Sequence, residues 1–355
     1  MEKKQNILDL SFESLKLFLL EKINIKEEKI NMRAQQIFAA VYQKGIKNFD
    51  SLTTLPLELR KKLNESFFFN NSKIVKKFTS LDKTLKFLVE LSDGNKVECV
   101  YIPEKSRGTI CISSQVGCSL TCSFCRSGTQ RLVKNLTVSE IIGQIILVKN
   151  ELKDWGDQKI ISNIVFMGQG EPLINLNNLK TSVKILRDKN GLNYGNKKIT
   201  VSTSGIANKI PEAADEIGTY LALSLHAPND KLREEIMPIN KKFKIKELVK
   251  QLKYYTSVVK EPIFLEYVML KGVNDTEECA KQLVKLMSQF PSKVNLIEFN
   301  SWPGVKFEPT ERKDIEKFSR YIQEKGYMSF IRRSRGDDVL AACGQLRTES
   351  ERIKI

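Results

Sequence analysis

The chain has 355 residues, 41% of them hydrophobic, which is enough to bury a sizeable core and excludes a disordered composition. Lys and Arg outnumber Asp and Glu by 58 to 42, giving a formal net charge of +16 that favours a polyanionic partner such as nucleic acid. A genome that favours lysine codons would also raise the net charge. Charge alone is therefore equally consistent with a basic surface that does not bind nucleic acid. The sequence contains neither an apolar run of roughly 18 residues nor an apolar signal region, so we expect a cytoplasmic protein without membrane contact.

The first part of the chain has the pattern of a small helical domain. Apolar residues recur at three-to-four spacing over Ser11–Leu20 and Met32–Tyr42, as on one face of a helix, and Pro56 opens a third short helix. We therefore expect residues 1–70 to form a helical accessory domain.

A hairpin pattern follows this domain. Two runs with strand character, Thr84–Leu91 and Lys96–Ile102, flank the turn signal Asp-Gly-Asn at positions 93–95. Residues 71–108 are therefore expected to form a β-hairpin linker region.

From about Thr109 the sequence alternates between strands and helices. Six apolar, often β-branched runs have strand character: Thr109–Ser113, Asn163–Met167, Ile199–Ser202, Tyr220–Leu225, Ile263–Met269 and Val294–Phe299. The clearest helix between them is Thr137–Leu152, which starts with the capping-box pattern of Thr137 and Glu140. Strands that alternate with helices are parallel, so the expected fold class is α/β, with a partial (β/α)6 barrel over residues 109–335. A further strand, Met328–Arg332, precedes a C-terminal segment at 336–355.

Three cysteines, Cys118, Cys122 and Cys125, follow the first barrel strand at C-x3-C-x2-C spacing. In a reducing compartment such a group is a ligand set rather than a disulfide framework. Electron-transfer ferredoxins use four cysteines, so three indicate a [4Fe–4S] cluster with one open iron that S-adenosylmethionine (SAM) can bind. A zinc site without its fourth ligand, or chance clustering, is the alternative interpretation.

Short polar and glycine-containing turns end the other barrel strands, where ligands of parallel barrels gather. They contain Gly170, Glu171, Ser202, Ser224, Leu225, His226 and Asn300. Glycine permits close backbone approach to a ligand, and Glu171 can accept hydrogen bonds from an ammonium group. Each turn alone is explained by caps and turns, but together at strand ends they indicate a SAM site. His226, the only histidine, is equally explained as a structural residue.

Four further cysteines lie outside the cluster spacing. Cys99 and Cys279 are expected to be inert buried residues. Cys111 lies in the first barrel strand, and Cys343 lies in a loop-like segment after the barrel.

Together these residues resemble the RlmN/Cfr family of radical SAM RNA methyltransferases over nearly the whole chain. The segments that match the family in order are ISSQVGC (112–118), GQGEP (168–172), STSG (202–205), SLHAPND (224–230), FNSWPG (299–304) and CGQL (343–346). The resemblance is more specific than the cysteine spacing, which indicates only the superfamily.

The resemblance implies a mechanism that uses two SAM molecules per turnover. Cys343 takes a methyl group from one SAM, and a 5′-deoxyadenosyl radical made from the second removes a hydrogen from that methyl group. The carbon radical adds to adenine, a base removes the ring proton, and Cys111 attacks Cys343 to form a disulfide that releases the product.

By the same resemblance, Glu98 is the proton acceptor, although from sequence alone it reads as an exposed carboxylate on a hairpin strand. The seven residues at the strand ends match SAM-contacting positions. Arg126 departs from the small residue or His expected after the cluster. Arg332, Arg333, Arg335 and Arg347, near Cys343, are candidates for phosphate contacts, with a solvated basic surface as the alternative.

The implied substrate is carbon 2 of an adenine in 23S rRNA and of an adenine beside the anticodon in tRNA. The alternatives are methylation of carbon 8 of the same rRNA adenine, a radical SAM enzyme with a non-RNA substrate, and an RNA-binding protein with a redox-sensing cluster. Val116 resembles the carbon-2 group. We also expect a reducing electron donor of the flavodoxin type and a monomeric enzyme.

Overall fold

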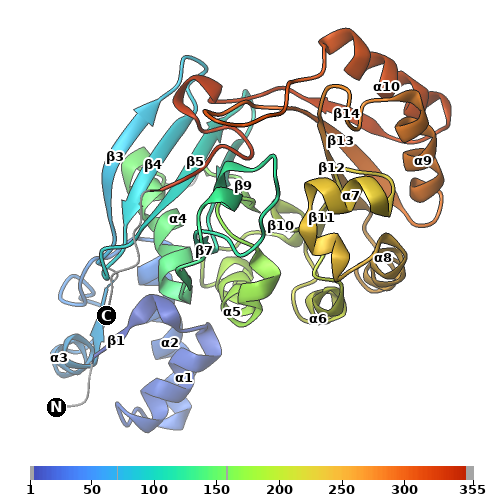
Figure 1. Cartoon of the computed structure of the whole chain (residues 1–355). Coiled ribbons are helices and arrows are strands. Elements are labelled where there is room, and N and C mark those ends of the chain that lie inside the picture. The colour runs from blue at the N-terminus through green and yellow to red at the C-terminus, as the bar shows by residue number, and fades with distance from the viewer. Residues whose placement is uncertain (1–3, 70, 157–158, 349–355) are drawn as a thin grey trace.

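A computed structural model describes residues 4–69, 71–156 and 159–348 and contains one large curved sheet (Figure 1). Its strand order is β14-β13-β12-β11-β10-β9-β6-β5-β4-β3. The strands from β6 to β14 are parallel to one another. They are β6 (Gly108–Cys111), β9 (Asn163–Phe166), β10 (Ile199–Thr203), β11 (Tyr220–Ser224), β12 (Ile263–Met269), β13 (Ser292–Glu298) and β14 (Ser329–Arg332). The predicted partial barrel is therefore confirmed, and β14 continues it in parallel.

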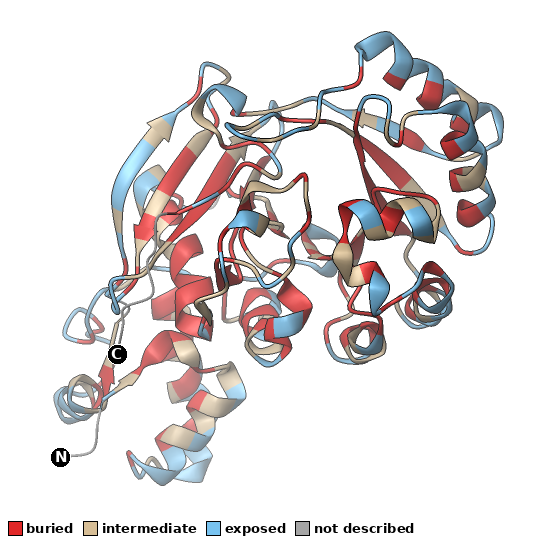
Figure 2. Ribbon diagram, in the orientation of Figure 1, coloured by how far each residue is buried: buried red, intermediate tan, exposed pale blue. Residues whose placement is uncertain are grey.

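Helices alternate with these strands and cover the outside of the sheet (Figure 1). They are α4 (Val138–Leu152), α5 (Leu176–Arg187), α6 (Ile210–Glu216), α7 (Asp230–Ile236), α8 (Ile245–Val259), α9 (Glu277–Met287) and α10 (Arg312–Glu324). The buried faces of the helices meet the buried strands in one continuous core (Figure 2). None of the described helices is long and apolar enough to cross a membrane.

Residues 71–108 extend the barrel sheet at its β6 edge. They form the antiparallel strands β3 (Lys73–Thr79), β4 (Leu85–Glu90) and β5 (Lys96–Pro103). The predicted hairpin corresponds to β4 and β5, and β5 pairs with β6. Because β5 is hydrogen-bonded to β6, these strands continue the barrel sheet beyond its first parallel strand.

The N-terminal part is helical, as predicted, with α1 (Phe12–Glu21), α2 (Glu27–Tyr42) and α3 (Leu57–Ser66). Two short segments, β1 (Gln5–Asn6) and β2 (Phe67–Phe68), pair in parallel and bring its ends together. Its apolar helix faces belong to the same core as the barrel.

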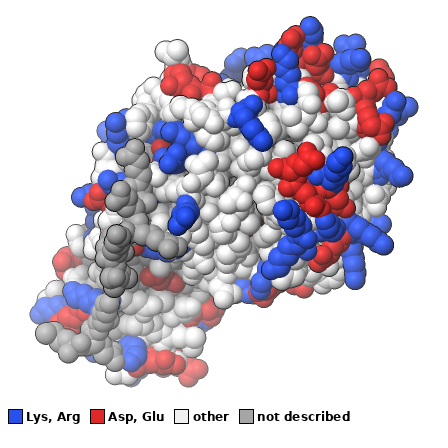
Figure 3. All heavy atoms as spheres, in the orientation of Figure 1, with Lys and Arg blue, Asp and Glu red and all other residues white. Residues whose placement is uncertain are grey.

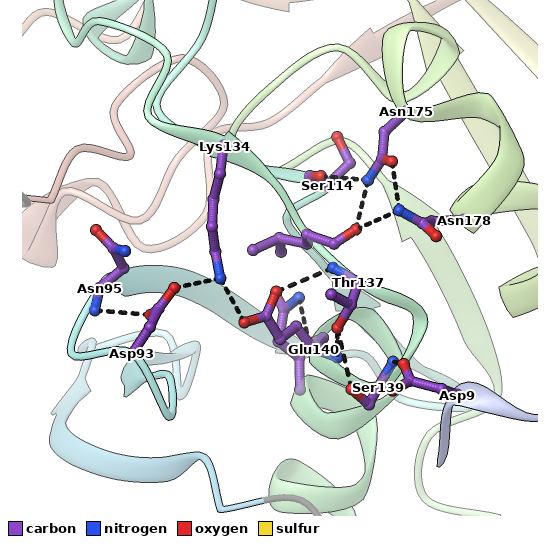
Figure 4. Close-up of polar contacts among 12 residues, drawn as sticks. Asp9, Asp93, Asn95, Ser114, Lys134, Thr137, Ser139, Glu140, Asn175 and Asn178 are labelled. Atoms are coloured by element: carbon purple, nitrogen blue, oxygen red, sulfur yellow. Dashed lines mark hydrogen bonds and ion pairs between the residues drawn. The ribbon is translucent and has the colours of Figure 1, made fainter. Parts of the chain in front are cut away.

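The N-terminus of α4 joins three parts of the molecule (Figure 4). The predicted capping box is present: the Thr137 hydroxyl accepts the Glu140 N–H at 3.3 Å, and the Glu140 carboxylate accepts the Thr137 N–H at 2.9 Å. Asp9 of the N-terminal domain accepts the Ser139 N–H at 2.7 Å. Lys134, which precedes the helix, binds both Glu140 and Asp93 in the β4–β5 turn. The helix start thus connects the N-terminal domain, the hairpin and the barrel.

Candidate active site

The three cysteines of the C-x3-C-x2-C segment lie on the loop that leaves β6, at the carboxyl ends of the barrel strands. Cys122 is buried, and Cys118 and Cys125 are half-buried. Burial raises the pKa of all three thiols, that of Cys118 to about 12, and the neighbouring cysteines raise the pKa of Cys118 and Cys122 further. Burial thus disfavours all three thiolates, and a coordinating metal cation would stabilise them.

The donor set fits an iron–sulfur cluster. The Leu120 N–H lies 3.4 Å from the Cys118 sulfur, a contact that favours the thiolate. Among the described residues no three His, Cys, Asp or Glu side chains converge as ligands of a single metal ion. The three thiolates of a [4Fe–4S] site bind three different irons, so they need not converge on one point.

The Gly-Gln-Gly-Glu-Pro turn after β9 is fixed against the segment that leads into the cysteine loop. Gly170 has φ +95°, and a side chain there would lie 2.4 Å from the Gln115 Cβ, so only glycine fits. Gln115 accepts the Glu171 N–H at 2.8 Å through its Oε1. Glu171 is buried and accepts the N–H groups of Ser204 at 2.7 Å and Leu173 at 3.2 Å. Burial raises the pKa of Glu171, so a cationic ligand group beside it would stabilise its charge.

The remaining predicted SAM-contacting residues also lie at strand ends. Ser202 is in β10, Ser224 ends β11, and Leu225 and His226 follow it. Asn300 follows β13, and its amide nitrogen lies 3.4 Å from the Cys343 carbonyl oxygen. Because neighbouring parallel strands end at one side of the sheet, these positions lie at the same edge of the barrel as the cysteine loop.

His226 is buried and neutral. Its Nδ1 accepts the Val268 N–H at 3.0 Å, so the ring proton lies on Nε2, and its ring packs edge-to-face on Phe124 with centroids 4.7 Å apart. Burial, and then the nearby Arg233, lower the pKa of His226 to about 3. Asn274 binds the His226 carbonyl oxygen at 2.8 Å. These contacts hold the residue in place at φ +55°.

This neutral histidine predicts an acid-dependent loss of stability. Its pKa is about 3 in the folded chain and 6.5 when unfolded, so stability falls as the pH drops below 6.5. His226→Asn, which tolerates a positive φ, removes this effect. From pH 7 to pH 5, the wild type should lose about 2 kcal/mol more unfolding free energy than the variant. Urea unfolding at both pH values measures this, and equal losses would contradict it.

Arg233 in α7 is a structural centre of the site that sequence reasoning missed. Its buried guanidinium donates to the carbonyl oxygens of Ser204 at 2.7 Å, Ser224 at 3.1 Å and Leu225 at 3.1 Å. It also donates to the Asn240 amide oxygen at 2.8 Å. Burial lowers its pKa to about 10. One side chain thus joins the ends of β10 and β11 beside Cys122.

Arg233→Met should therefore destabilise the fold. The change leaves three carbonyl oxygens and an amide without their donor, at an expected cost of about 3–5 kcal/mol in unfolding free energy. Arg320→Leu, on the exposed side of α10, is the control and should change stability by less than about 0.5 kcal/mol. Denaturant unfolding of both variants tests this, and similar small changes would contradict the central role of Arg233.

Cys111 and Cys343, far apart in sequence, lie near each other at the end of β6. Cys111 packs against the buried apolar group of Val100, Ala341 and Leu346, the last two of which flank Cys343. Cys343 is exposed. Although the residue is exposed, protein groups around its thiol displace enough water to raise the pKa of Cys343, and the Arg332 guanidinium lowers it. Burial and then Cys343 raise the pKa of Cys111 to about 12, so the two thiols are electrostatic neighbours.

The Cys343 segment is also joined to the cysteine loop. The Arg126 N–H donates to the Gly344 carbonyl oxygen at 2.7 Å, and the Arg126 guanidinium lies 3.5 Å from the Gln345 carbonyl oxygen. Trp302 donates through Nε1 to the Phe124 carbonyl oxygen at 3.0 Å. The arginine that departs from the family pattern thus contacts the segment of Cys343.

Glu98 in β5 is buried, so its interpretation as an exposed hairpin carboxylate is wrong. One oxygen lies 3.0 Å from the Lys86 ammonium nitrogen, and the other accepts the Arg347 N–H at 2.9 Å. Burial raises the pKa of Glu98, and Lys86 opposes that shift. Cys99 and Cys279 are buried, as predicted.

Two of the four arginines near Cys343 have acidic neighbours. The Arg332 guanidinium lies 3.8 Å from the buried Glu266 carboxylate, which also accepts from Asn295 at 2.7 Å. Arg335 lies 3.4 Å from Asp82 and donates to the Pro103 carbonyl oxygen at 2.7 Å. Sequence reasoning missed Glu266, although a carboxylate inside the apolar run Ile263–Met269 was a visible signal.

The fold and the cysteine loop are those of the radical SAM superfamily, whose profile matches residues 112–284. The profile of the ribosomal RNA large subunit methyltransferase N-terminal domain matches residues 5–68. The chain is 44% identical to the dual-specificity RNA methyltransferase RlmN of Jannaschia sp., covering 98% of this chain and 91% of that protein. It is also 44% identical to RlmN of Agrobacterium fabrum, covering 100% of this chain and 91% of that protein.

A solved radical SAM methyltransferase from Sphaerobacter thermophilus superimposes with a TM-score of 0.89 at 35% identity, covering 97% of this chain and 99% of that one. The chain belongs to the RlmN family of radical SAM methyltransferases.

Proposed function

We propose that the protein methylates carbon 2 of an adenine in 23S rRNA and of an adenine beside the anticodon of tRNA, with Cys343 as methyl carrier. The observation that carries this proposal is the meeting of three segments. Cys111 packs on the residues around Cys343, and the residue after Cys125 is hydrogen-bonded to the residue after Cys343. A methyl group on Cys343 would thus lie between the resolving thiol and the cluster loop.

Cys118, Cys122 and Cys125 would hold the [4Fe–4S] cluster, which supplies the electron for reductive SAM cleavage. Gly170 and Glu171 would receive the SAM amino group, and Ser202, Ser224, Leu225, His226 and Asn300 would contact the rest of the molecule. Asn300 would also hold the Cys343 main chain in place. Arg332 would favour the Cys343 thiolate, the form that accepts a methyl group.

After the methyl carbon has bonded to adenine, the ring proton must leave and the Cys343–carbon bond must break. Glu98 would accept the proton. The unpaired electron of the radical adduct would be taken up by the oxidised iron–sulfur cluster. The Cys111 thiolate would then attack the Cys343 sulfur to form a sulfur–sulfur bond, and the electron pair of the broken sulfur–carbon bond would stay on the product carbon, which takes up a proton to become the methyl group. The resulting disulfide must be reduced before the next turnover.

The net charge of +16 supports an RNA substrate. In the view of Figure 3, Lys and Arg side chains stand around a largely uncharged centre, and charges of both signs gather at one side. We assign RNA binding to the helical domain at residues 1–70. The segment at 336–355, of which residues 349–355 lie outside the described structure, would carry the methyl-accepting cysteine. The target base would leave its stack to reach Cys343.

The deciding experiment is anaerobic reconstitution with iron, sulfide, SAM and a flavodoxin-type electron donor, followed by mass analysis of nucleosides from treated rRNA and tRNA. We expect 2-methyladenosine from both. Only 8-methyladenosine would support the alternative rRNA activity, and unmethylated RNA would point to a non-RNA substrate. S-adenosylhomocysteine and 5′-deoxyadenosine should form in equal amounts, because two SAM molecules are used per product. We further propose a cytoplasmic monomer.

A further inference from the structure

The segment that carries Cys343 runs from β14 back to the antiparallel strands β3, β4 and β5 (Figure 1). At its start, Asp82 in the β3–β4 turn accepts the Gly336 N–H at 3.1 Å. Two residues later, the Asp338 carboxylate accepts hydrogen bonds from the Leu81 N–H at 3.1 Å and from the Ser80 hydroxyl. These hydrogen bonds fix the first part of the segment to the β3–β4 turn.

A buried ion pair contacts the segment on both sides of Cys343. Lys86 in β4 and Glu98 in β5 are diagonal neighbours in the antiparallel pair, where Lys86 lies opposite Val100, and 3.0 Å separates the charged atoms. Their side chains are 7% and 6% exposed, so water screens them little. Lys86 also donates to the Leu340 carbonyl oxygen at 3.2 Å, and Glu98 accepts the Arg347 N–H at 2.9 Å.

The two contacts lie three residues before Cys343 and four residues after it. A buried lysine and carboxylate retain their charges only when both are paired and hydrogen-bonded. Removing either charge weakens its partner's contact with the segment as well. Burial raises the pKa of Glu98, which Lys86 counteracts, in agreement with this coupling.

We propose that Lys86 is a positioning residue for methyl transfer: with Glu98 it clamps both flanks of Cys343 and holds the thiol beside Cys111 and the cysteine loop. This inference rests on Cys343 being the methyl carrier. It adds a second role for Glu98, because both carboxylate oxygens are occupied by Lys86 and the Arg347 N–H.

The test compares Lys86→Met with the matched control Lys73→Met in the reconstituted holoenzyme. Lys73 pairs with Glu90 across β3 and β4 at 2.9 Å on the same sheet, but it is exposed, and within the described part of the chain it makes no hydrogen bond to residues 336–348. Hydrogen exchange with mass detection follows peptides that contain Leu340 and Arg347. Peptide mass after SAM addition follows methylation of Cys343.

Lys86→Met should speed exchange at Arg347 at least tenfold and slow Cys343 methylation at least tenfold, with cluster absorbance unchanged. Lys73→Met should match the wild type, and Lys86→Arg should recover most of the methylation rate. If Lys86→Met does not fold, Lys86→Gln removes the same charge but keeps a polar side chain, and it should show both effects more weakly.

Unchanged exchange in Lys86→Met or, where it does not fold, in Lys86→Gln would overturn the clamp. Faster exchange with an unchanged methylation rate would overturn the positioning role. If Cys343 of the wild type takes no methyl group from SAM, the proposed function fails, whereas the exchange comparison still decides whether the clamp exists. Glu98→Gln keeps an acceptor for the Arg347 N–H but cannot take up the adenine proton. Because this variant also removes the charge that pairs with Lys86, Cys343 methylation should slow as in Lys86→Met, and slow release of RNA in addition would report the proton-accepting role.

Discussion

Replacing Cys111 with Ala should trap the enzyme on its RNA substrate. In the proposed reaction, Cys343 is bonded to the base through the methyl carbon until Cys111 attacks its sulfur. Without that thiol the covalent adduct accumulates, and turnover should fall by at least about a thousandfold, as expected when a group needed for covalent catalysis is removed. Denaturing gel electrophoresis of the anaerobic reaction would show an RNA–protein band.

Two further cysteine variants serve as controls for this experiment. Cys343→Ala should abolish both the band and methylation, because the methyl carrier is gone. Cys279→Ala changes a buried thiol in α9, away from the barrel opening, and should leave turnover intact. Normal turnover by Cys111→Ala without any crosslinked species would exclude its resolving role. Methylation by Cys343→Ala would exclude the carrier.

Removing any one of Cys118, Cys122 or Cys125 should eliminate the iron–sulfur absorbance and all methylation. The three thiols are enclosed, and burial raises the pKa of each, so two remaining cysteines offer an incomplete ligand set in an environment that disfavours free thiolates. The expected loss of activity is again at least about a thousandfold, since the radical cannot be formed without the cluster.

Iron and sulfide analysis with visible spectra of the anaerobically purified variants would measure this. Cys99→Ala, on a strand of the same sheet, tests whether loss of any buried cysteine has the same effect, and it should retain the cluster. Methylation by a wild-type protein that holds zinc or no metal would contradict the radical mechanism altogether.

These two sets of cysteine variants also separate the classes of function left open by the sequence. An RNA-binding protein with a redox-sensing cluster would depend on Cys118, Cys122 and Cys125 but not on Cys111 or Cys343. A radical SAM enzyme with a small substrate would form no crosslink to RNA. Only the proposed methyltransferase requires both sets of cysteines and forms the RNA adduct.

Local sequence was sufficient for much of the fold. The strands of the barrel lie within a few residues of their predicted ranges, because β-branched runs and the turns between them act over short distances. The α4 capping box needs only Thr137 and Glu140 at the right spacing. The cysteine spacing likewise placed three candidate ligands on one loop, because their separation along the chain limits how far apart they can be.

Contacts between distant segments were decided only by the tertiary structure. Nothing near Glu98 in the sequence indicates that Lys86 and the Arg347 N–H enclose it, and a charged residue on a hairpin strand reads as exposed. Arg233 acts by joining carbonyl oxygens of two other strand ends. Such partners are selected by packing of the whole sheet. The sequence by itself therefore determined the elements and the cysteine loop, whereas which buried charges meet, and how Cys343 is held, depended on long-range contacts that short-range patterns do not encode.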